Sequence, residues 1–234
     1  MKFGSPRRHY RVCDSTNQRA RELAAAGAPG GTVVTAGEQR QGRGRQGRSW
    51  TAPPDGALLY SGLLRPLAAD DQLLPLAVPL AVAAAIEDLA AVRCAVKWPN
   101  DIWIDGRKCA GVLIEARPRD GWAVIGIGLN VSIAEEAFPP ELRETATSIG
   151  NGVAVAEALA RVNERLSEWV DADQSRVREE FTRRDGLAGR RIAWEEGEGV
   201  ANGIDERGNL LVETETGRVA LGAGEVHLAV SPAG

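Results

Sequence analysis

The chain is poor in the residues that build metal centres and disulfide frameworks. Its 234 residues include only three cysteines and two histidines, and no Cys-x-x-Cys pair occurs. A small, odd number of cysteines argues against a disulfide framework and is expected in a reducing compartment, so we predict a cytoplasmic protein. Two histidines argue against a His-based zinc site. We interpret Cys13 and Cys109 as small core residues.

The sequence also lacks the hydrophobic segments expected of a signal peptide or a membrane span. The amino terminus, MKFGSPRRHY, lacks the apolar region of a signal peptide. The longest apolar run, LLPLAVPLAVAAAIEDLAAV, contains two prolines and ends among acidic residues. It predicts a buried helix over residues 72–91 and not a membrane span. A formal net charge of −4 argues that the molecule as a whole does not bind polyanions.

The remaining pattern predicts an α+β fold in two domains. A helix is expected from the capping residues 14–17 to Gly27, and amphipathic spacing predicts one or two helices over residues 152–184. Short β-branched and apolar runs predict strands, and Asp105-Gly106 is a strong hairpin signal. We therefore expect a mixed or antiparallel sheet with packed helices over residues 1–186. Short alternating runs from Leu187 onward predict a barrel-like module of about five strands over residues 187–234.

Residues 37–50, GEQRQGRGRQGRSW, alternate arginines with glycines. We expect this segment to be mobile until an anion binds, because its charges repel one another and its glycines are costly to order. The simplest alternatives are a solvated surface loop and an RNA-binding arm. Three features favour a nucleotide phosphate instead. Predicted strands tether both ends, glycines let the backbone approach a ligand, and Trp50 offers a flat stacking surface.

Three further stretches carry polar residues where a ligand could bind. The first is KWPNDIWIDGRKCAGVLIEA, residues 97–116, in which Lys108 stands at the start of a predicted apolar strand. Such a lysine is unusual unless its ammonium reaches a cavity, although snorkelling to the surface is the simpler alternative. VIGIGLNVS puts Gly126 and Gly128 on one strand face, where they would leave a groove beside Asn130. DSTN, residues 14–17, supplies short donors and acceptors for a neutral polar group, or only a helix cap.

Taken in order, DSTNQ, GRGRQGRSW, KWPNDIWIDGRKCAGVLIE and GIGLNV closely resemble the biotin–protein ligases. The family pattern is G-R-G-R-x-G-R-x-W, then K-W-P-N-D, K-x-x-G-I-L-x-E and G-x-G-x-N. The resemblance covers residues 14–131 and, more loosely, the C-terminal module. It implies the family's catalytic fold, which is similar to class II aminoacyl-tRNA synthetases, and an SH3-like C-terminal barrel. Because the chain begins almost at the first motif, it resembles the short form without an N-terminal DNA-binding domain.

The resemblance implies ATP-dependent conversion of biotin to biotinoyl-5′-AMP and transfer to a lysine of a biotin carboxyl carrier protein, such as that of acetyl-CoA carboxylase. Mg²⁺ is expected with the ATP, held largely by phosphate oxygens, and no protein ligand is assigned to it. The expected catalytic residues are Lys108 and Arg43. The expected biotin-binding residues are Ser15, Thr16, Asn17, Gln39, Gly42, Arg43, Gly44, Arg45, Lys108, Gly111, Leu113, Gly126 and Gly128. The expected nucleotide-binding residues are Arg43, Arg45, Gln46, Arg48, Trp50, Lys97, Asn100, Asp101 and Asn130.

Two positions depart from the family pattern. Gln46 stands where a basic residue can occur, and Ala229 stands where some members carry an arginine that approaches the nucleotide. The second departure leaves open how much the C-terminal module contributes to ATP binding.

Three alternatives stay open at this point. A lipoate or octanoate ligase or transferase of the same superfamily would not be expected to combine the arginine segment with KWPND. A nucleic-acid-binding module fits poorly with the acidic charge. A repressor would need a DNA-reading domain before residue 14. We expect no DNA or membrane partner, and a homodimer that pairs through sheet edges is compatible with the sequence.

Overall fold

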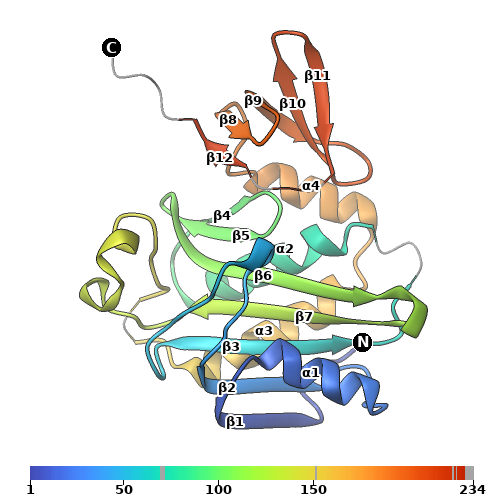
Figure 1. The fold of residues 1–234 in the computed structure, drawn as a ribbon, viewed down its shortest axis with the longest axis vertical. Helices are drawn as coiled ribbons and strands as arrows, with labels where there is room; N and C mark the ends of the chain where they lie inside the picture. Colours follow the sequence, from blue (N-terminus) through green and yellow to red (C-terminus); the bar gives the residue numbers. More distant parts are fainter. Residues whose placement is uncertain (69–71, 151, 223, 225, 230–234) are drawn as a thin grey trace.

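The fold consists of two sheets and the helices packed against them (Figure 1). The computed structural model describes residues 1–68, 72–150, 152–222, 224 and 226–229. The larger sheet has seven strands in the order β1-β2-β3-β7-β6-β5-β4. In that order the strands are β1 (Arg7–Cys13), β2 (Val33–Gln39), β3 (Ala57–Leu64), β7 (Trp122–Asn130), β6 (Arg107–Arg117), β5 (Asp101–Ile104) and β4 (Cys94–Lys97).

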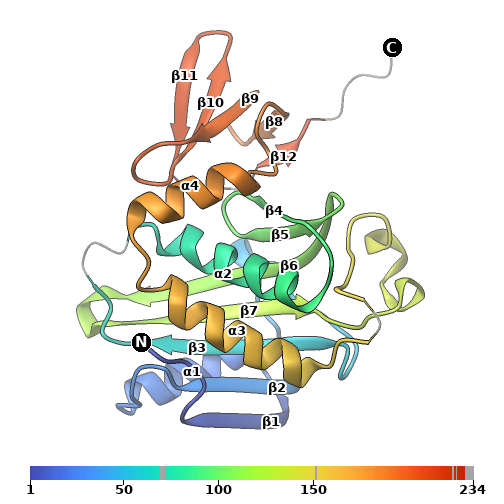
Figure 2. The same cartoon turned by 180° about the vertical axis from the view of Figure 1, so that it is seen from behind.

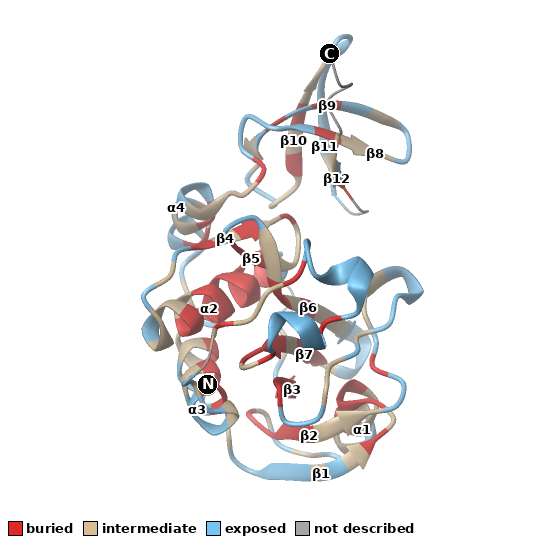
Figure 3. Ribbon diagram, turned by 90° about the vertical axis from the view of Figure 1, so that its left-hand side faces the viewer, coloured by how far each residue is buried: buried red, intermediate tan, exposed pale blue. Residues whose placement is uncertain are grey.

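Pairing in this sheet agrees with the prediction for the central strands. β1 and β2 are parallel, and every other neighbouring pair is antiparallel. The hairpin between β5 and β6 turns at Asp105 and Gly106, whose φ angles are 50° and 76°. Two successive positive φ angles match the twist of a two-residue hairpin, which confirms the Asp-Gly signal. The polar edge strand β1 was not predicted, and Figure 3 shows it largely exposed.

Helices cover both faces of the larger sheet. Helix α1 (Thr16–Ala25) packs on β2, β3 and β7, whereas α2 (Leu74–Leu89) and α3 (Val155–Trp169) lie on the opposite face (Figure 2). Helix α4 (Gln174–Arg184) packs beside α2 and β4, so residues 152–184 form two helices rather than one. Short 3₁₀ helices are η1 (Arg45–Gly47), η2 (Pro118–Asp120), η3 (Glu135–Ala137) and η4 (Pro140–Leu142). Among the described residues, no helix combines the length and apolar character needed to cross a membrane.

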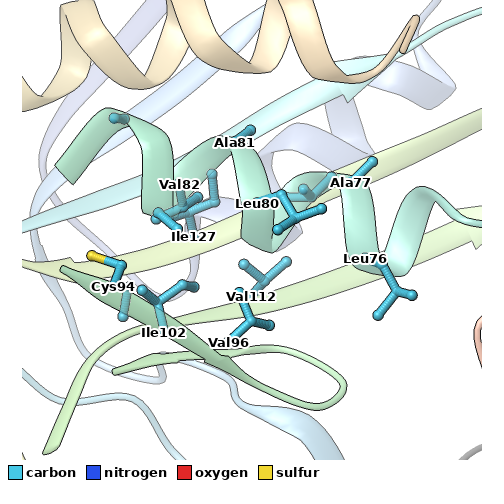
Figure 4. Packing of buried hydrophobic residues seen from close by; sticks show 14 of the residues in the cluster. Leu76, Ala77, Leu80, Ala81, Val82, Cys94, Val96, Ile102, Val112 and Ile127 are labelled. Atoms are coloured by element: carbon cyan, nitrogen blue, oxygen red, sulfur yellow. The ribbon is translucent and has the colours of Figure 1, made fainter. Parts of the chain in front are cut away.

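Helix α2 is the centre of the main hydrophobic core. It is apolar on nearly all sides, as expected for a helix buried between a sheet and other helices. Leu76, Leu80 and Val82 face Val96, Ile102, Val112 and Ile127 of the sheet (Figure 4). Because this packing fills one face of the sheet, the opposite face of β6 and β7 is left for α1 and for ligands.

The amino terminus of α1 is capped differently from the sequence expectation. Ser15 is the N-cap residue, but its side chain makes no capping hydrogen bond. The backbone N–H of Thr16 instead donates to Oε1 of Gln39 at 2.7 Å. Gln39 ends β2, so a side chain from the sheet satisfies one of the free N–H groups at the start of the helix.

The C-terminal strands form a separate five-stranded antiparallel sheet in the order β11-β10-β9-β8-β12. They are β8 (Arg191–Trp194), β9 (Gly197–Ile204), β10 (Leu210–Thr214), β11 (Gly217–Leu221) and β12 (His227–Leu228). The number of strands agrees with the prediction. Within the described residues, β11 and β12 stand at opposite edges and do not pair, so a closed barrel is not seen.

This second sheet packs directly on the first part of the chain. The indole N–H of Trp98 donates to the Gly208 carbonyl at 3.0 Å, and buried residues of both sheets belong to one hydrophobic cluster. The C-terminal strands are therefore held against the end of the larger sheet where β4 ends and β5 begins.

The core predicts a clear stability difference between two leucines. Leu80 is 0% exposed in α2, whereas Leu142 is 40% exposed. We expect Leu80→Ala to lower the free energy of unfolding by about 2–5 kcal/mol, because it leaves a cavity in packed surroundings. Leu142→Ala serves as the matched control and should cost less than about 1 kcal/mol. Urea unfolding measures both values, and equal losses would contradict the assigned core.

Candidate active site

A cavity of about 810 Å³ opens on the α1 face of the larger sheet. It lies between the start of α1, the arginine segment, the loop over residues 133–146 and the C-terminal strand β12. The predicted residues that line it are Ser15, Thr16, Asn17, Gln39, Arg43, Gly44, Arg45, Gln46, Arg48, Trp50, Lys97, Asn100, Asp101, Lys108, Gly111, Leu113, Gly126, Gly128 and Asn130. Gly42 is the exception: it is buried, and a Cβ there would lie 2.2 Å from the Trp50 carbonyl oxygen.

The floor of the cavity is made by strand positions that lack side chains. Gly111 of β6 pairs with Gly128 of β7. A Cβ on Gly128 would lie 2.3 Å from Cε2 of Trp50, and a Cβ on Gly111 would lie 3.2 Å from Cζ3 of the same ring. The indole therefore rests directly on the backbone of two strands. Its N–H is buried and has no hydrogen-bond partner in the described part of the chain.

The groove expected above Gly126 and Gly128 is occupied by protein side chains. Trp50 covers Gly128, and a Cβ on Gly126 would lie 2.2 Å from Oδ1 of Asn17. The amide of Asn17 also donates to the Glu115 carboxylate at 2.8 Å. Both glycines are thus needed for close packing by α1 and the arginine segment, a role that the sequence did not reveal.

Lys108 reaches the cavity as the sequence predicted, and its ammonium is held in place there. Nζ lies 2.7 Å from Oδ1 of Asp101 and 5.6 Å from the centre of the Trp50 ring. Asp101 pairs with Gly111 across the β5–β6 ladder, so one carboxylate, one ammonium and one indole meet above a single row of the sheet. The Lys108 side chain is 34% exposed, which leaves part of its charge open to a bound anion.

The arginine segment folds as a short hairpin over this site. Arg43 and Ser49 form an antiparallel bridge, and the Gly44 N–H donates to the Arg48 carbonyl at 2.7 Å. At the tip, Gln46 has a φ of 53° and is exposed. The sequence predicted that this segment is mobile without ligand, whereas the structure shows one ordered arrangement; its mobility stays a prediction.

Arg45 links the hairpin to two other parts of the chain. It donates to Oδ1 of Asn100 at 3.1 Å and to the carbonyl of Gly224 at 3.2 Å. Asn100 is itself fixed, because its amide donates to the Val112 carbonyl at 2.9 Å. The guanidinium therefore joins the hairpin, the loop before β5 and the C-terminal module around one cavity.

Two parts of the cavity wall were missed by sequence reasoning. Ile133, Phe138 and Leu142 supply an apolar wall from the loop after β7. Lys108 fixes that loop, since its N–H donates to the Thr145 carbonyl at 2.7 Å and its carbonyl accepts from Thr147 at 2.9 Å. The C-terminal residues Gly224, Val226, His227 and Leu228 form a second part of the wall. In the sequence, only the apolar residues of the proline-containing loop AFPPEL hinted at the apolar wall.

The thiols beside the site show no sign of nucleophilic reactivity. Cys13 and Cys109 are buried, as expected for small core residues. Burial raises the pKa of both thiols above the ordinary value. Both therefore stay protonated near neutral pH and are poor nucleophiles. Among residues 1–68, 72–150, 152–222, 224 and 226–229, no cluster of three His, Cys, Asp or Glu residues could hold a metal ion.

Comparisons with known proteins match two parts of the chain to described families. Residues 9–132 match the biotin/lipoate A/B protein ligase family, and residues 189–228 match the biotin protein ligase C terminal domain. A bifunctional ligase/repressor BirA of Bacillus subtilis is 33% identical, with 94% of this chain and 73% of the relative covered. A biotin–[acetyl-CoA-carboxylase] ligase of Mycobacterium tuberculosis is 35% identical, with 92% of this chain and 86% of the relative covered.

A solved structure with a similar fold also has a related sequence. A biotin protein ligase from Aquifex aeolicus, in complex with biotin and ATP, is 30% identical to this chain and has a TM-score of 0.84. The alignment covers 97% of this chain and 100% of that one.

The contact between Trp50 and Gly128 predicts that removing the indole suppresses the loss of stability caused by Gly128→Ala. In Gly128→Ala the new methyl group would overlap the indole, so we expect a loss of about 1–3 kcal/mol in the free energy of unfolding. In a Trp50→Ala background the ring is gone, and the same substitution should cost less than about 0.5 kcal/mol. Urea unfolding of the four proteins measures the difference, and an equal cost in both backgrounds would show that the ring does not rest on Gly128.

Proposed function

The chain belongs to the biotin/lipoate A/B protein ligase family, and from this premise we propose that it is a biotin–protein ligase that uses ATP. The observation that carries the proposal is the order in which polar, aromatic and charged groups follow one another along β7 in a single cavity. Neutral polar groups of α1 lie over Gly126, Trp50 lies over Gly128 next to the Lys108 ammonium, and Asn130 follows on the same strand. The arginine hairpin covers this row.

The neutral end of the cavity suits the ureido ring of biotin. Ser15 and Thr16 are 2% and 3% exposed, and Gln39 is bonded to Thr16. These side chains carry hydrogen-bond donors and acceptors but no charge, which fits a neutral polar ring better than an ion. Leu113 supplies apolar surface for the rest of the molecule.

The cationic end suits the first chemical step. An oxygen of the biotin carboxylate attacks the α-phosphorus of ATP, the bond to the β-phosphate oxygen breaks, and pyrophosphate leaves with the electron pair. Two anions must approach each other, so fixed cations lower the barrier. Lys108 is held by Asp101 at the start of this region, and Arg43, Arg45 and Arg48 line the cavity around it. Asp101 orients the ammonium and leaves its other N–H donors for carboxylate and phosphate oxygens.

The hairpin suits the second step as well. An uncharged lysine amine of the carrier protein attacks the acyl carbon, the bond to the phosphate oxygen breaks, and AMP leaves while the nitrogen loses a proton. Until the carrier arrives, the mixed anhydride has to be kept from water. A hairpin of arginines and glycines that folds over the adenylate achieves this, and Arg45 ties it to the C-terminal module.

The described lining of the cavity fits Mg²⁺ only in part. Asp101 is the one carboxylate among the described lining residues, and it is already paired with Lys108. The Mg²⁺ that we expect with ATP would therefore take its ligands mainly from phosphate oxygens and water. That ion would neutralise the triphosphate and hold it in one geometry.

Several finer assignments belong to the proposal. The adenine is assigned to the apolar wall of Ile133, Phe138 and Leu142 near Asn130, whose amide already donates to the Thr147 carbonyl at 2.9 Å. The boundary between residues 186 and 187, the closed SH3-like form of the C-terminal module, the cytoplasmic location and a homodimer stay predictions. The carrier domain of acetyl-CoA carboxylase is the proposed partner, supported by the names of the similar ligases.

A lipoate or octanoate ligase is the second candidate, because the matching family includes both substrate classes. The match of residues 189–228 to a C-terminal domain of biotin protein ligases favours biotin. A nucleic-acid-binding module would leave the neutral pocket beside α1 without a purpose.

The proposed reaction predicts one mass change. Incubation of the chain with ATP, Mg²⁺, biotin and a biotin carboxyl carrier domain should add one biotinyl group to a lysine of the carrier, as measured by mass spectrometry. A carrier whose acceptor lysine is replaced by arginine serves as the control and should gain nothing. Modification by lipoate but not by biotin would overturn the substrate assignment.

The position of Lys108 predicts a loss in the chemical step. Lys108→Ala should slow single-turnover formation of the adenylate by about 100-fold, because the cation between carboxylate and phosphate is removed. Biotin and ATP binding should weaken less. Lys2→Ala, an exposed lysine outside the cavity, is the matched control. If Lys108→Ala forms the adenylate at the rate of the unmodified chain, its proposed role is wrong.

A further inference from the structure

The arginine hairpin separates the cavity of the candidate active site from a second hollow on its outer side. This outer groove has a volume of about 690 Å³ and lies between the hairpin and β6. The residues that line both hollows are Arg43, Gly44, Arg45, Gln46, Arg48, Ser49 and Leu113. Gln46 and Gly47 at the tip of the hairpin are exposed, so water reaches the outer groove. The place of the hairpin therefore decides whether water also reaches the cavity.

The hydrogen bonds within the hairpin fix its shape but not its place. Arg43 bridges to Ser49, and the Gly44 N–H donates to the Arg48 carbonyl. Both contacts join residues of the hairpin to each other, so they would survive if the hairpin moved as a unit. Its place over the cavity has to come from contacts with other segments of the chain.

Arg45 makes two such contacts. One guanidinium nitrogen, Nη1, donates to Oδ1 of Asn100 at 3.1 Å, and the other, Nη2, donates to the Gly224 carbonyl at 3.2 Å. The second acceptor is a backbone atom, which no substitution removes. The first belongs to the side chain of Asn100, so this half of the contact can be tested by mutation.

The orientation of the Asn100 amide is fixed by groups that can play only one role. Nδ2 donates to the Val112 carbonyl at 2.9 Å, and a carbonyl oxygen only accepts. A guanidinium only donates, so the amide oxygen must face Arg45. The backbone is held as well, because the Val112 N–H donates to the Asn100 carbonyl at 3.0 Å. Asn100 thus presents a fixed acceptor to the hairpin from the edge of the sheet.

We propose that Asn100 is a positioning residue that holds the arginine hairpin over the cavity through Arg45 and does not itself bind the nucleotide. A hydrogen bond from a charged donor is stronger than one between neutral groups, which suits it to this task. Without the amide, the hairpin leaves the sheet more often, and the cavity opens to the outer groove. The consequence for the adenylate rests on the proposed function, whereas the contact with the hairpin can be tested without any ligand.

The first measurement uses the chain without ligand. Trypsin cuts after arginine, so the rates of cleavage after Arg43 and Arg48, followed by mass spectrometry, report how often the hairpin opens. Asn100→Ala should raise both rates about 3- to 10-fold, the size of one hydrogen bond. Cleavage at sites outside the hairpin should keep its rate.

The second measurement follows biotinoyl-5′-AMP that stays bound after excess biotin, ATP and Mg²⁺ have been removed. Asn100→Ala should shorten the half-life of the bound adenylate about 3- to 10-fold, because the hairpin no longer keeps water out and the ligand in. The rate of single-turnover adenylate formation at saturating substrates should change less than about twofold, since Lys108 and its partner Asp101 are untouched.

A double-mutant cycle with Arg45→Ala separates positioning from direct binding. If Asn100 acts only through Arg45, the single variant Arg45→Ala shortens the half-life at least as much as Asn100→Ala. Adding Asn100→Ala to Arg45→Ala should then shorten it by less than about twofold further. A direct contact between Asn100 and the nucleotide would instead multiply the two losses, and the proposed role would be wrong.

Two further variants serve as controls. Asn202→Ala removes an exposed amide that lines neither hollow, and it should leave tryptic cleavage and half-life unchanged. Asn100→Ala keeps the backbone bond to Val112, so its thermal unfolding should stay close to that of the unmodified chain. If it does not fold, Asn100→Ser supplies the comparison, because a serine side chain is too short to reach Arg45.

The outcomes are distinct. Equal tryptic cleavage of the hairpin in the unmodified chain and in Asn100→Ala would overturn the inference, because Asn100 would then not hold the hairpin. If the unmodified chain forms no adenylate from biotin and ATP, the proposed function fails, while the cleavage rates still decide the role of Asn100. Faster cleavage together with a half-life that Arg45→Ala makes insensitive to Asn100 is the result that supports the inference.

Discussion

The close approach of side chains to a bare stretch of sheet is the constraint on which the rest of the site depends. Gly126 and Gly128 of β7 and Gly111 of β6 leave no Cβ on the α1 face. Trp50 and Asn17 can therefore lie directly on the strand backbones, and each brings its own segment with it. Trp50 holds the arginine hairpin against the sheet, and Asn17 holds the start of α1 there. Any side chain in this row would lift one of the two segments away from Lys108 and the polar pocket.

Charge is distributed to serve the same cavity. The chain is acidic overall, yet the cavity wall holds Lys97, Lys108 and three arginines with a single carboxylate, Asp101, among its described residues. Asp101 fixes the Lys108 ammonium at 2.7 Å and keeps it beside the indole. Local cations on an acidic molecule attract a nucleotide to one place, whereas a generally basic surface would bind polyanions without selection.

Much of this arrangement could be predicted from the sequence, and the remainder shows what a sequence hides. The Asp105-Gly106 turn, helix α2 and the strands around Lys108 follow from local patterns, because turn chemistry and apolar spacing act over a few residues. The motifs also named most of the polar residues that line the cavity. The contacts that fill the space above Gly126 and Gly128 were not predictable, since they join residues far apart in the chain. The exposed strand β1 and the apolar wall around Phe138 carry no motif, and their roles follow only from tertiary packing.

The central claim is that the glycine floor holds Trp50 in place and so brings the Lys108 ammonium and the arginine hairpin to the atoms that react. A crystal structure of the chain with biotinyl-5′-AMP tests this most directly. The account predicts that the indole still rests on Gly128, that the ammonium lies within about 3 Å of an acyl or phosphoryl oxygen, and that the hairpin covers the adenylate. A hairpin turned into solvent, with Lys108 bonded to Asp101 alone, would contradict it.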